Sequence, residues 1–228
     1  MMPGRLEGKV AIVTGAGCVG PGWGNGRATC VRFAQEGAKI FAVDLEAETM
    51  TETLERTRAE GGEIEPHICD VTDRSEVEAM VSACIDRFDA VDILVNNVGG
   101  SAKGGATVID EEAWDRQLDF NLKSVYLTCR AVLPHMEEKG RGAIVNTSST
   151  SGMRYTGSPQ VAYASAKAAI IQFSRVTAVE FAPKGIRVNT VVPGQLHTPM
   201  VETRLAGQRM GGDVDALLAS RVKRIPLG

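Results

Sequence analysis

The chain has 228 residues, of which 43% are hydrophobic and 23% are charged, and its formal net charge is −3. These values are typical of a globular protein with a substantial core, and they argue against nucleic acid as a partner. No apolar stretch approaches the ~20 residues that span a bilayer, and the start lacks a signal-peptide hydrophobic region, so we expect a cytoplasmic protein without a membrane partner.

Short apolar runs alternate with longer stretches of helical periodicity along the whole chain. The runs are rich in β-branched residues, which is typical of parallel strands buried on both faces. They cover residues 10–13, 39–43, 63–68, 93–95, 143–145 and 186–192, and the helical stretches cover 26–36, 47–60, 74–88, 111–138 and 160–182. This alternation predicts one Rossmann-type α/β domain over residues 1–228, a doubly wound parallel sheet in a three-layer α/β/α arrangement.

A glycine-rich sequence, residues 14–26, separates the first predicted strand from the first predicted helix. Glycines in this position let the backbone approach a pyrophosphate, which the helix N-terminus then faces. The sequence therefore predicts a dinucleotide site. Trp23 in this loop either shields the cofactor or anchors the loop at the surface, and we expect Cys18 to be incidental.

The second predicted strand is followed by Asp44. A carboxylate there can accept hydrogen bonds from the adenosine ribose and repels a 2′-phosphate. No Lys or Arg follows directly, and Trp23 precedes Gly24 where a basic residue could meet that phosphate. We therefore predict NAD rather than NADP as the cofactor.

Tyr163 and Lys167 lie one helical turn apart, downstream of an apolar run that ends in Ser148 and Ser149. Residues at i and i+4 share a helix face. A phenol titrates near ~10, and a neighbouring positive charge favours the phenolate. Tyr163 is therefore a candidate for proton transfer. Tyr126 also has a basic residue at i+4, but no serine-ended run precedes it, and we expect it to be a packing or interface residue.

The five cysteines are scattered and odd in number, and the three histidines are dispersed. This spacing argues against a disulfide framework and a structural zinc site, so we expect no metal. His197 is kept in view because it falls in a segment that we place near the substrate.

Taken in order, these motifs resemble those of the short-chain dehydrogenase/reductase family along essentially the whole chain. The matching elements are the glycine-rich turn, Asp70-Val71 at the end of the third strand, Asn96-Asn97-Val98-Gly99 at the end of the fourth, Asn121, the serine-ended run, Tyr163-x-x-x-Lys167, and Pro193-Gly194 followed by Thr198. The resemblance implies an oxidoreductase that interconverts a secondary alcohol and a ketone.

The resemblance also implies a role for each matching residue. Ser149, with Ser148 as the alternative, would position the substrate oxygen, and Tyr163 would transfer the proton. Lys167 would favour the phenolate and bind the nicotinamide ribose, while Asn121 would hold a water linked to Lys167. The implied cofactor-binding residues are Gly15, Gly24, Asn25, Gly26, Asp44, Asp70, Val71, Asn97, Gly99, Tyr163, Lys167, Pro193, Gly194, Leu196 and Thr198.

Two features depart from the family pattern. The stretch from Gly15 to Gly24 is longer than usual, so which early glycine contacts phosphate stays open. The chain also stops at Gly228, where the family continues with another helix and strand, so we expect the natural polypeptide to be longer.

Residues 196–224 are predicted to form a substrate lid. Its apolar side chains either bind a moderately apolar substrate or pack against the domain. We expect a homo-oligomer, a dimer or a tetramer, that acts on a small alcohol or ketone. Two alternatives are a non-catalytic dinucleotide-binding regulator or scaffold, and an NAD-dependent epimerase or dehydratase. The second usually needs a larger C-terminal substrate domain.

Overall fold

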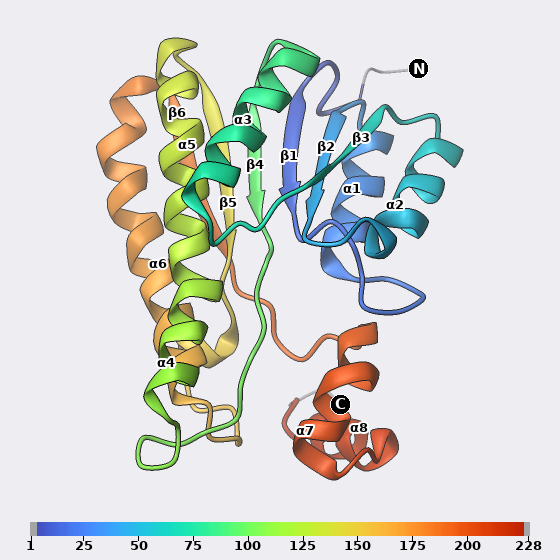
Figure 1. Cartoon of the computed structure of the whole chain (residues 1–228), viewed down its shortest axis with the longest axis vertical. Helices are drawn as coiled ribbons and strands as arrows, with labels where there is room; N and C mark the ends of the chain where they lie inside the picture. Colours follow the sequence, from blue (N-terminus) through green and yellow to red (C-terminus); the bar gives the residue numbers. More distant parts are fainter. Residues whose placement is uncertain (1–3, 226–228) are drawn as a thin grey trace.

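The structure is a computed structural model that describes residues 4–225, apart from the side chains of residues 208 and 209. In this range six parallel strands form one sheet in the order β3-β2-β1-β4-β5-β6 (Figure 1). They are β1 (Val10–Thr14), β2 (Lys39–Asp44), β3 (Ile64–Ile68), β4 (Ile93–Asn96), β5 (Gly142–Thr147) and β6 (Ile186–Val191). The strand order reverses between β1 and β4, and doubly wound sheets bind ligands at such a point.

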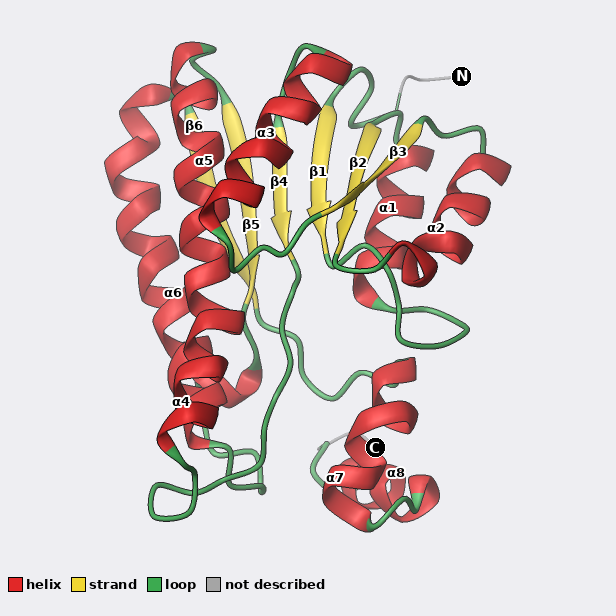
Figure 2. Ribbon diagram, in the orientation of Figure 1, coloured by secondary structure: helices red, strands yellow, loops and turns green. Residues whose placement is uncertain are grey.

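Helices cover both faces of this sheet, as the sequence predicts (Figure 2). The helices are α1 (Asn25–Gln35), α2 (Ala47–Ala59), α3 (Arg74–Phe88), α4 (Glu111–Leu118), α5 (Ser124–Glu138) and α6 (Val161–Phe181). One apolar core joins the sheet to α3, α5 and α6, and a second joins the opposite face to α1 and α2. Successive strand residues such as Ile12 and Val13 therefore lie in different cores, which explains the uninterrupted apolar runs.

Several helices begin at an aspartate whose side chain accepts a hydrogen bond from a main-chain amide of the first turn. Asp73 caps α3 and Asp110 caps α4 in this way. Such caps stabilise a helix start by ~1 kcal/mol. The third strand ends at Ile68, so Asp70 and Val71 lie in the loop after it rather than at its end. The predicted helix at 111–138 is interrupted by a π-helical turn at Asp119–Lys123.

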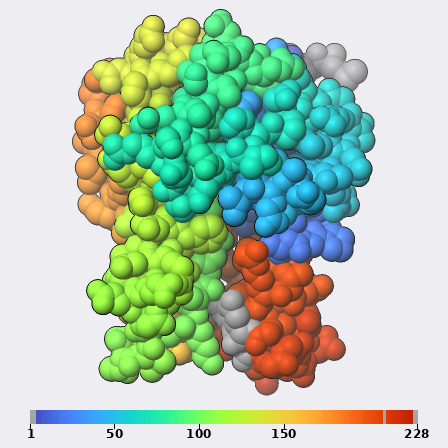
Figure 3. Space-filling view, viewed as in Figure 1, coloured from blue at the N-terminus to red at the C-terminus, as the bar shows by residue number. Residues whose placement is uncertain are grey.

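The lid forms a small helical unit beyond the carboxyl ends of the strands (Figure 1). It contains a π-helical turn at Val201–Leu205, followed by α7 (Ala206–Met210) and α8 (Val214–Val222). Its apolar residues Val201, Ala206 and Leu217 are buried against one another. In the space-filling view the lid lies next to the glycine-rich loop (Figure 3). Within the described residues, no helix has the length and apolar character needed to cross a membrane.

Candidate active site

A cleft of about 420 Å³ opens between the carboxyl ends of the strands and the lid. It is lined by the glycine-rich turn, the ends of β2, β4 and β5, the N-terminal half of α6 and the lid. Every residue to which the resemblance assigns a catalytic or cofactor-binding role lines this cleft except Asn121, which is fully buried. The fold thus brings together residues that lie far apart in the sequence, such as Gly15 and Thr198.

The glycine-rich turn forms a narrow backbone cradle at the start of α1. Gly15 has a φ of +64°, which other residues rarely adopt. A Cβ on Gly26 would lie 1.8 Å from the Gly15 carbonyl oxygen, and one on Gly24 would lie 2.9 Å from the Cys18 sulfur. Only glycine fits at position 26, where the neighbour is backbone, and the small residues of the turn leave the amides at the N-terminus of α1 open to an anion.

Side chains of α1 and α2 hold the long loop between Gly15 and Gly24 in place. The buried Arg27 donates to the Thr53 hydroxyl at 3.1 Å and to the Gly22 carbonyl. The Arg56 guanidinium lies over the Trp23 ring, with its carbon 4.5 Å from the ring centroid. Trp23 does not line the cleft, so of the two alternatives the structure supports the surface anchor.

Asp44 is held at the end of β2 by main-chain amides. One carboxylate oxygen accepts a hydrogen bond from the Gly17 amide at 2.8 Å, and the other accepts one from Leu45 at 2.9 Å. A Cβ on Gly17 would lie 2.2 Å from the Thr49 hydroxyl. The loop therefore packs directly against the second strand and α2, and the carboxylate keeps free lone pairs for a further donor.

The two serines after β5 have different environments. The Ser148 hydroxyl is buried and donates to the Lys167 carbonyl at 2.6 Å. The Ser149 hydroxyl is half-buried and accepts a hydrogen bond from the Ser151 amide at 3.2 Å. Ser148 therefore joins β5 to α6, whereas Ser149 is the serine with a hydroxyl available for a ligand.

Tyr163 and Lys167 meet on the face of α6 that lines the cleft. The Lys167 ammonium lies 5.7 Å from the centre of the Tyr163 ring and donates to the Thr147 carbonyl at 2.9 Å. Burial lowers the pKa of Lys167 to about 8. A buried ammonium gains from an anionic neighbour, which is what a phenolate would provide.

Asn121 sits in the π-helical turn, with no exposed surface. Its amide side chain accepts from the Gly100 amide at 3.2 Å and donates to the Gly100 carbonyl at 3.1 Å. A Cβ on Gly99 would lie 2.8 Å from the Asn121 side-chain oxygen and 2.9 Å from the Lys167 ammonium nitrogen. Glycine at position 99 thus allows both groups to approach the same point.

The arrangement of these residues agrees with a known family. The sequence model described as short chain dehydrogenase matches residues 9–209. The chain belongs to the short-chain dehydrogenase/reductase family. Members of this family are oxidoreductases that bind a nicotinamide dinucleotide.

Relatives in this family match nearly all of the chain. The 3-oxoacyl-(acyl-carrier-protein) reductase of Thermotoga maritima is 36% identical over 224 residues, which are 98% of this chain and 85% of the relative. The crystal structure of a family member from Burkholderia xenovorans is 57% identical and superposes with a TM-score of 0.94, covering 98% of this chain and 84% of that chain. An NAD+-bound xylitol dehydrogenase is 30% identical with a TM-score of 0.86, covering 97% and 86%.

Some features of this short-chain dehydrogenase/reductase differ from the sequence expectations. His197 is exposed and pairs with Glu202 at 3.0 Å; its neighbours Leu196 and Thr198 line the cleft, but His197 does not. Cys18 does line the cleft.

Two sets of site residues were missed by the sequence analysis. Gln160 and Ser151 are joined by a 2.7 Å hydrogen bond beside Ser149. Three arginines of the lid also line the cleft: Arg204, Arg221 and Arg224. For Gln160, its position three residues before Tyr163 was the available signal.

Proposed function

We propose that the protein is an NAD-dependent oxidoreductase that interconverts a secondary alcohol and a ketone. The observation that carries this proposal is the pairing of the buried Lys167 ammonium with the Tyr163 ring, 5.7 Å away, in a cleft that also exposes Ser149. Together with Asn121, these residues form a complete proton-transfer set. That completeness argues against the alternative of a non-catalytic regulator or scaffold.

The residues that line the cleft are suited to hold a dinucleotide. The cradle formed by Gly15, Gly24 and Gly26 would hold the pyrophosphate at the N-terminus of α1. Asn25, Asn97 and Gly99 line the cleft near this cradle, and Pro193, Gly194, Leu196 and Thr198 line it beside β5 and the lid, where we place the nicotinamide.

Charge at the other end of the cleft favours NAD over NADP. The lining residues at and just after β2 and β3 include Asp44, Glu46 and Asp70, and no Lys or Arg is found among the described ones. A 2′-phosphate would meet these carboxylates without a compensating cation. Val71 adds an apolar surface there, suited to the adenine ring.

The residues around the reacting atoms suggest how the proton moves. A bound nicotinamide cofactor would supply the acceptor for the hydride of the carbinol carbon. Ser149 would donate a hydrogen bond to the substrate oxygen, and the Tyr163 phenolate would accept the hydroxyl proton. Lys167 would stabilise the phenolate, held in place by the Thr147 carbonyl. In the reverse direction Tyr163 returns the proton to the oxygen.

Association into a homo-oligomer is part of this proposal. Val176 and Val179 on α6 are 56% and 77% exposed, and Tyr126 on α5 is 40% exposed. Apolar side chains gathered on neighbouring helices favour burial against another copy of the chain. Sedimentation of the purified protein would measure the assembly state.

The decisive experiment is Tyr163→Phe. The substitution removes only the hydroxyl, so turnover of alcohols with NAD should fall by ~100-fold or more, because the proton acceptor is lost. NADH binding, followed by fluorescence, should stay within a few-fold of the wild type. Turnover retained in this variant would refute the proposed chemistry. Tyr126→Phe is the matched control, and it should behave like the wild type.

A further inference from the structure

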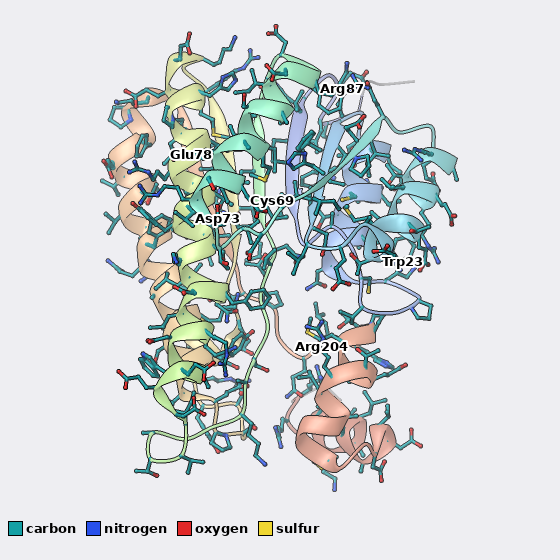
Figure 4. All side chains as sticks on the ribbon, viewed as in Figure 1. Trp23, Cys69, Asp73, Glu78, Arg87 and Arg204 are labelled. Atoms are coloured by element: carbon teal, nitrogen blue, oxygen red, sulfur yellow. The ribbon has the colours of Figure 1, made fainter. Side chains whose placement is uncertain are left out.

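The end of the cleft that faces the lid is cationic. Arg204, Arg221 and Arg224 all line it, together with Lys167. In Figure 4 Arg204 lies on the side of the lid that faces the sheet. Among the described residues, neither Arg204 nor Arg224 forms an ion pair with a carboxylate. Two arginines that line a cavity without pairing to a carboxylate of the described residues are suited to bind an anion.

The acidic residues that line the cleft follow other strands than the one that leads to Ser149. Asp44 and Glu46 follow β2, and Asp70 follows β3. Ser149 follows β5, and the strands β1 and β4 lie between β2 and β5. With ~4.8 Å between neighbouring strands, the separation is about 14 Å, which is more than a Debye length at physiological salt. The two ends of the cleft therefore have opposite charge.

Arg224 is the arginine tied most directly to the catalytic serine. It donates to the Thr156 carbonyl at 2.8 Å. The Thr156 hydroxyl lies 3.1 Å from the Ser151 hydroxyl, and the Ser151 amide donates to Ser149. The contact requires a glycine at position 157, since a Cβ there would lie 2.9 Å from the Arg224 guanidinium carbon. Only one of the five donors of Arg224 is used in this contact, which leaves a fork of N–H groups for a ligand.

Arg221 also lines this end of the cleft, but its role differs from that of Arg224. It is buried and donates to the Leu196 carbonyl at 2.9 Å, in the segment where we place the nicotinamide. Arg221 therefore positions that segment against the lid, and its charge adds to that of Arg224. Leu217 is buried within the lid, whereas Leu196, Met200, Val201 and Leu205 line the cleft, so the lid presents an apolar surface beside its arginines.

We infer that the substrate carries an anionic group, such as a carboxylate, and that Arg224 binds this group at the mouth of the cleft. The inference rests on the proposed function, because it assigns the substrate class of the same site. The planar guanidinium can form two parallel hydrogen bonds with a carboxylate, which fixes the orientation of the substrate as well as its affinity. The reacting alcohol then lies between this anchor and Ser149.

The test compares matched substrates. A panel of secondary alcohols carrying a carboxylate at varying distance is assayed with NAD beside the primary amides of the same compounds. We expect the acids to be preferred in kcat/KM by the wild type. Arg224→Gln should lower kcat/KM for the acids by ~10- to 100-fold and leave the amides nearly unchanged. Arg224→Lys should retain part of the preference, and Arg58→Gln, an exposed arginine of α2, is the control.

The possible outcomes separate the two proposals. If Arg224→Gln lowers kcat/KM equally for acids and amides, Arg224 only supports the lid and the inference is overturned. A raised KM for NAD with an unchanged KM for the acids would assign the arginine to the cofactor and would overturn it as well. If amides react as well as acids in the wild type, the proposed function stands and the anion site fails. If neither class reacts, the proposed function fails, and binding of the acids to the wild-type NADH complex but not to Arg224→Gln still decides the anion site.

Discussion

The Ser148 hydroxyl donates a 2.6 Å hydrogen bond to the main-chain carbonyl of Lys167, so the end of β5 is tied to the helix that carries this lysine. The neighbouring Ser149 makes no such link and turns its hydroxyl to the cleft, where it accepts one hydrogen bond from the Ser151 amide. Two adjacent serines thus serve different purposes: one fixes the position of Lys167, and the other is available to a substrate oxygen.

This difference predicts opposite effects for the two alanine variants. Ser149→Ala should lower kcat by ~100-fold or more, because a donor to the developing charge is lost, and its unfolding free energy should change by less than ~0.5 kcal/mol. Ser148→Ala should keep most of its activity and lose about 1 kcal/mol of stability, because a buried hydrogen bond is removed. Steady-state kinetics and urea unfolding of both variants would measure this. A reversed pattern would make Ser148 the catalytic serine.

The burial of Lys167 predicts a specific pH dependence of stability in the cofactor-free protein. Its pKa is lowered from 10.5 to about 8 in the folded state. Between these values the unfolded chain binds more protons than the folded one, so the stability contributed by this group rises with pH. Below pH ~8 both states are protonated, and the cost of the buried charge is constant.

Lys167→Met removes this dependence and serves as the comparison. The difference in unfolding free energy, wild type minus variant, should increase by as much as ~3 kcal/mol between pH 8 and pH 10.5. Denaturant unfolding at several pH values would measure it. A difference that is constant or falls over this range would show that the ammonium is not desolvated in the folded protein.

Features set by local spacing could be predicted from the sequence. Tyr163 and Lys167 are four residues apart, which is about one turn of any α-helix. A glycine-rich turn between a strand and a helix lets the backbone approach an anion at the helix N-terminus, wherever it occurs. The π-helical turn at Asn121 could not be predicted, because helical periodicity continues through residues 111–138 without a break. Its physical reason is tertiary: the Asn121 side chain pairs with both polar groups of Gly100, in a distant loop.

The environment of the lid was also beyond the sequence. Arg224 lies in the predicted lid, 75 residues from Ser149 in the chain, but nothing in the sequence indicates which lid side chains line the cleft. Their proximity depends on how α8 docks beneath the strand ends, which is set by contacts such as that between Arg221 and the Leu196 carbonyl. Trp23 is a further example: the sequence allowed it to shield the cofactor or to anchor the loop at the surface, and its contact with Arg56 in the folded protein supports the second role.

The close packing of the glycine-rich turn makes a third prediction. Gly26→Ala places a methyl group against the Gly15 carbonyl oxygen, 1.8 Å away in the unrelaxed structure. The turn must shift, so we expect a loss of ~1–3 kcal/mol or more in stability and a large loss of NADH affinity. Gly207→Ala is the control, because this helical glycine of α7 has open space around it. That variant should be unchanged or more stable by up to ~1 kcal/mol. Normal NADH binding by Gly26→Ala would rule out the cradle as the pyrophosphate site.

Asp44 supports the fourth prediction, which concerns the choice of cofactor. Its carboxylate accepts a hydrogen bond from the Gly17 amide and would also face the adenosine ribose. Two variants are therefore needed to distinguish the effect of its charge on the cofactor from its effect on the position of the loop. Asp44→Asn keeps an acceptor for the Gly17 amide but removes the charge, whereas Asp44→Ala removes both. We expect the wild type to prefer NAD. Both variants should lose much of this preference, because repulsion of a 2′-phosphate is lost in each, and only Asp44→Ala should also show weaker binding of both cofactors.

The ratio of kcat/KM for NAD and NADP measures the preference. If Asp44→Asn retains the wild-type ratio, the charge does not select the cofactor, and if the wild type works better with NADP, the assignment of NAD is wrong.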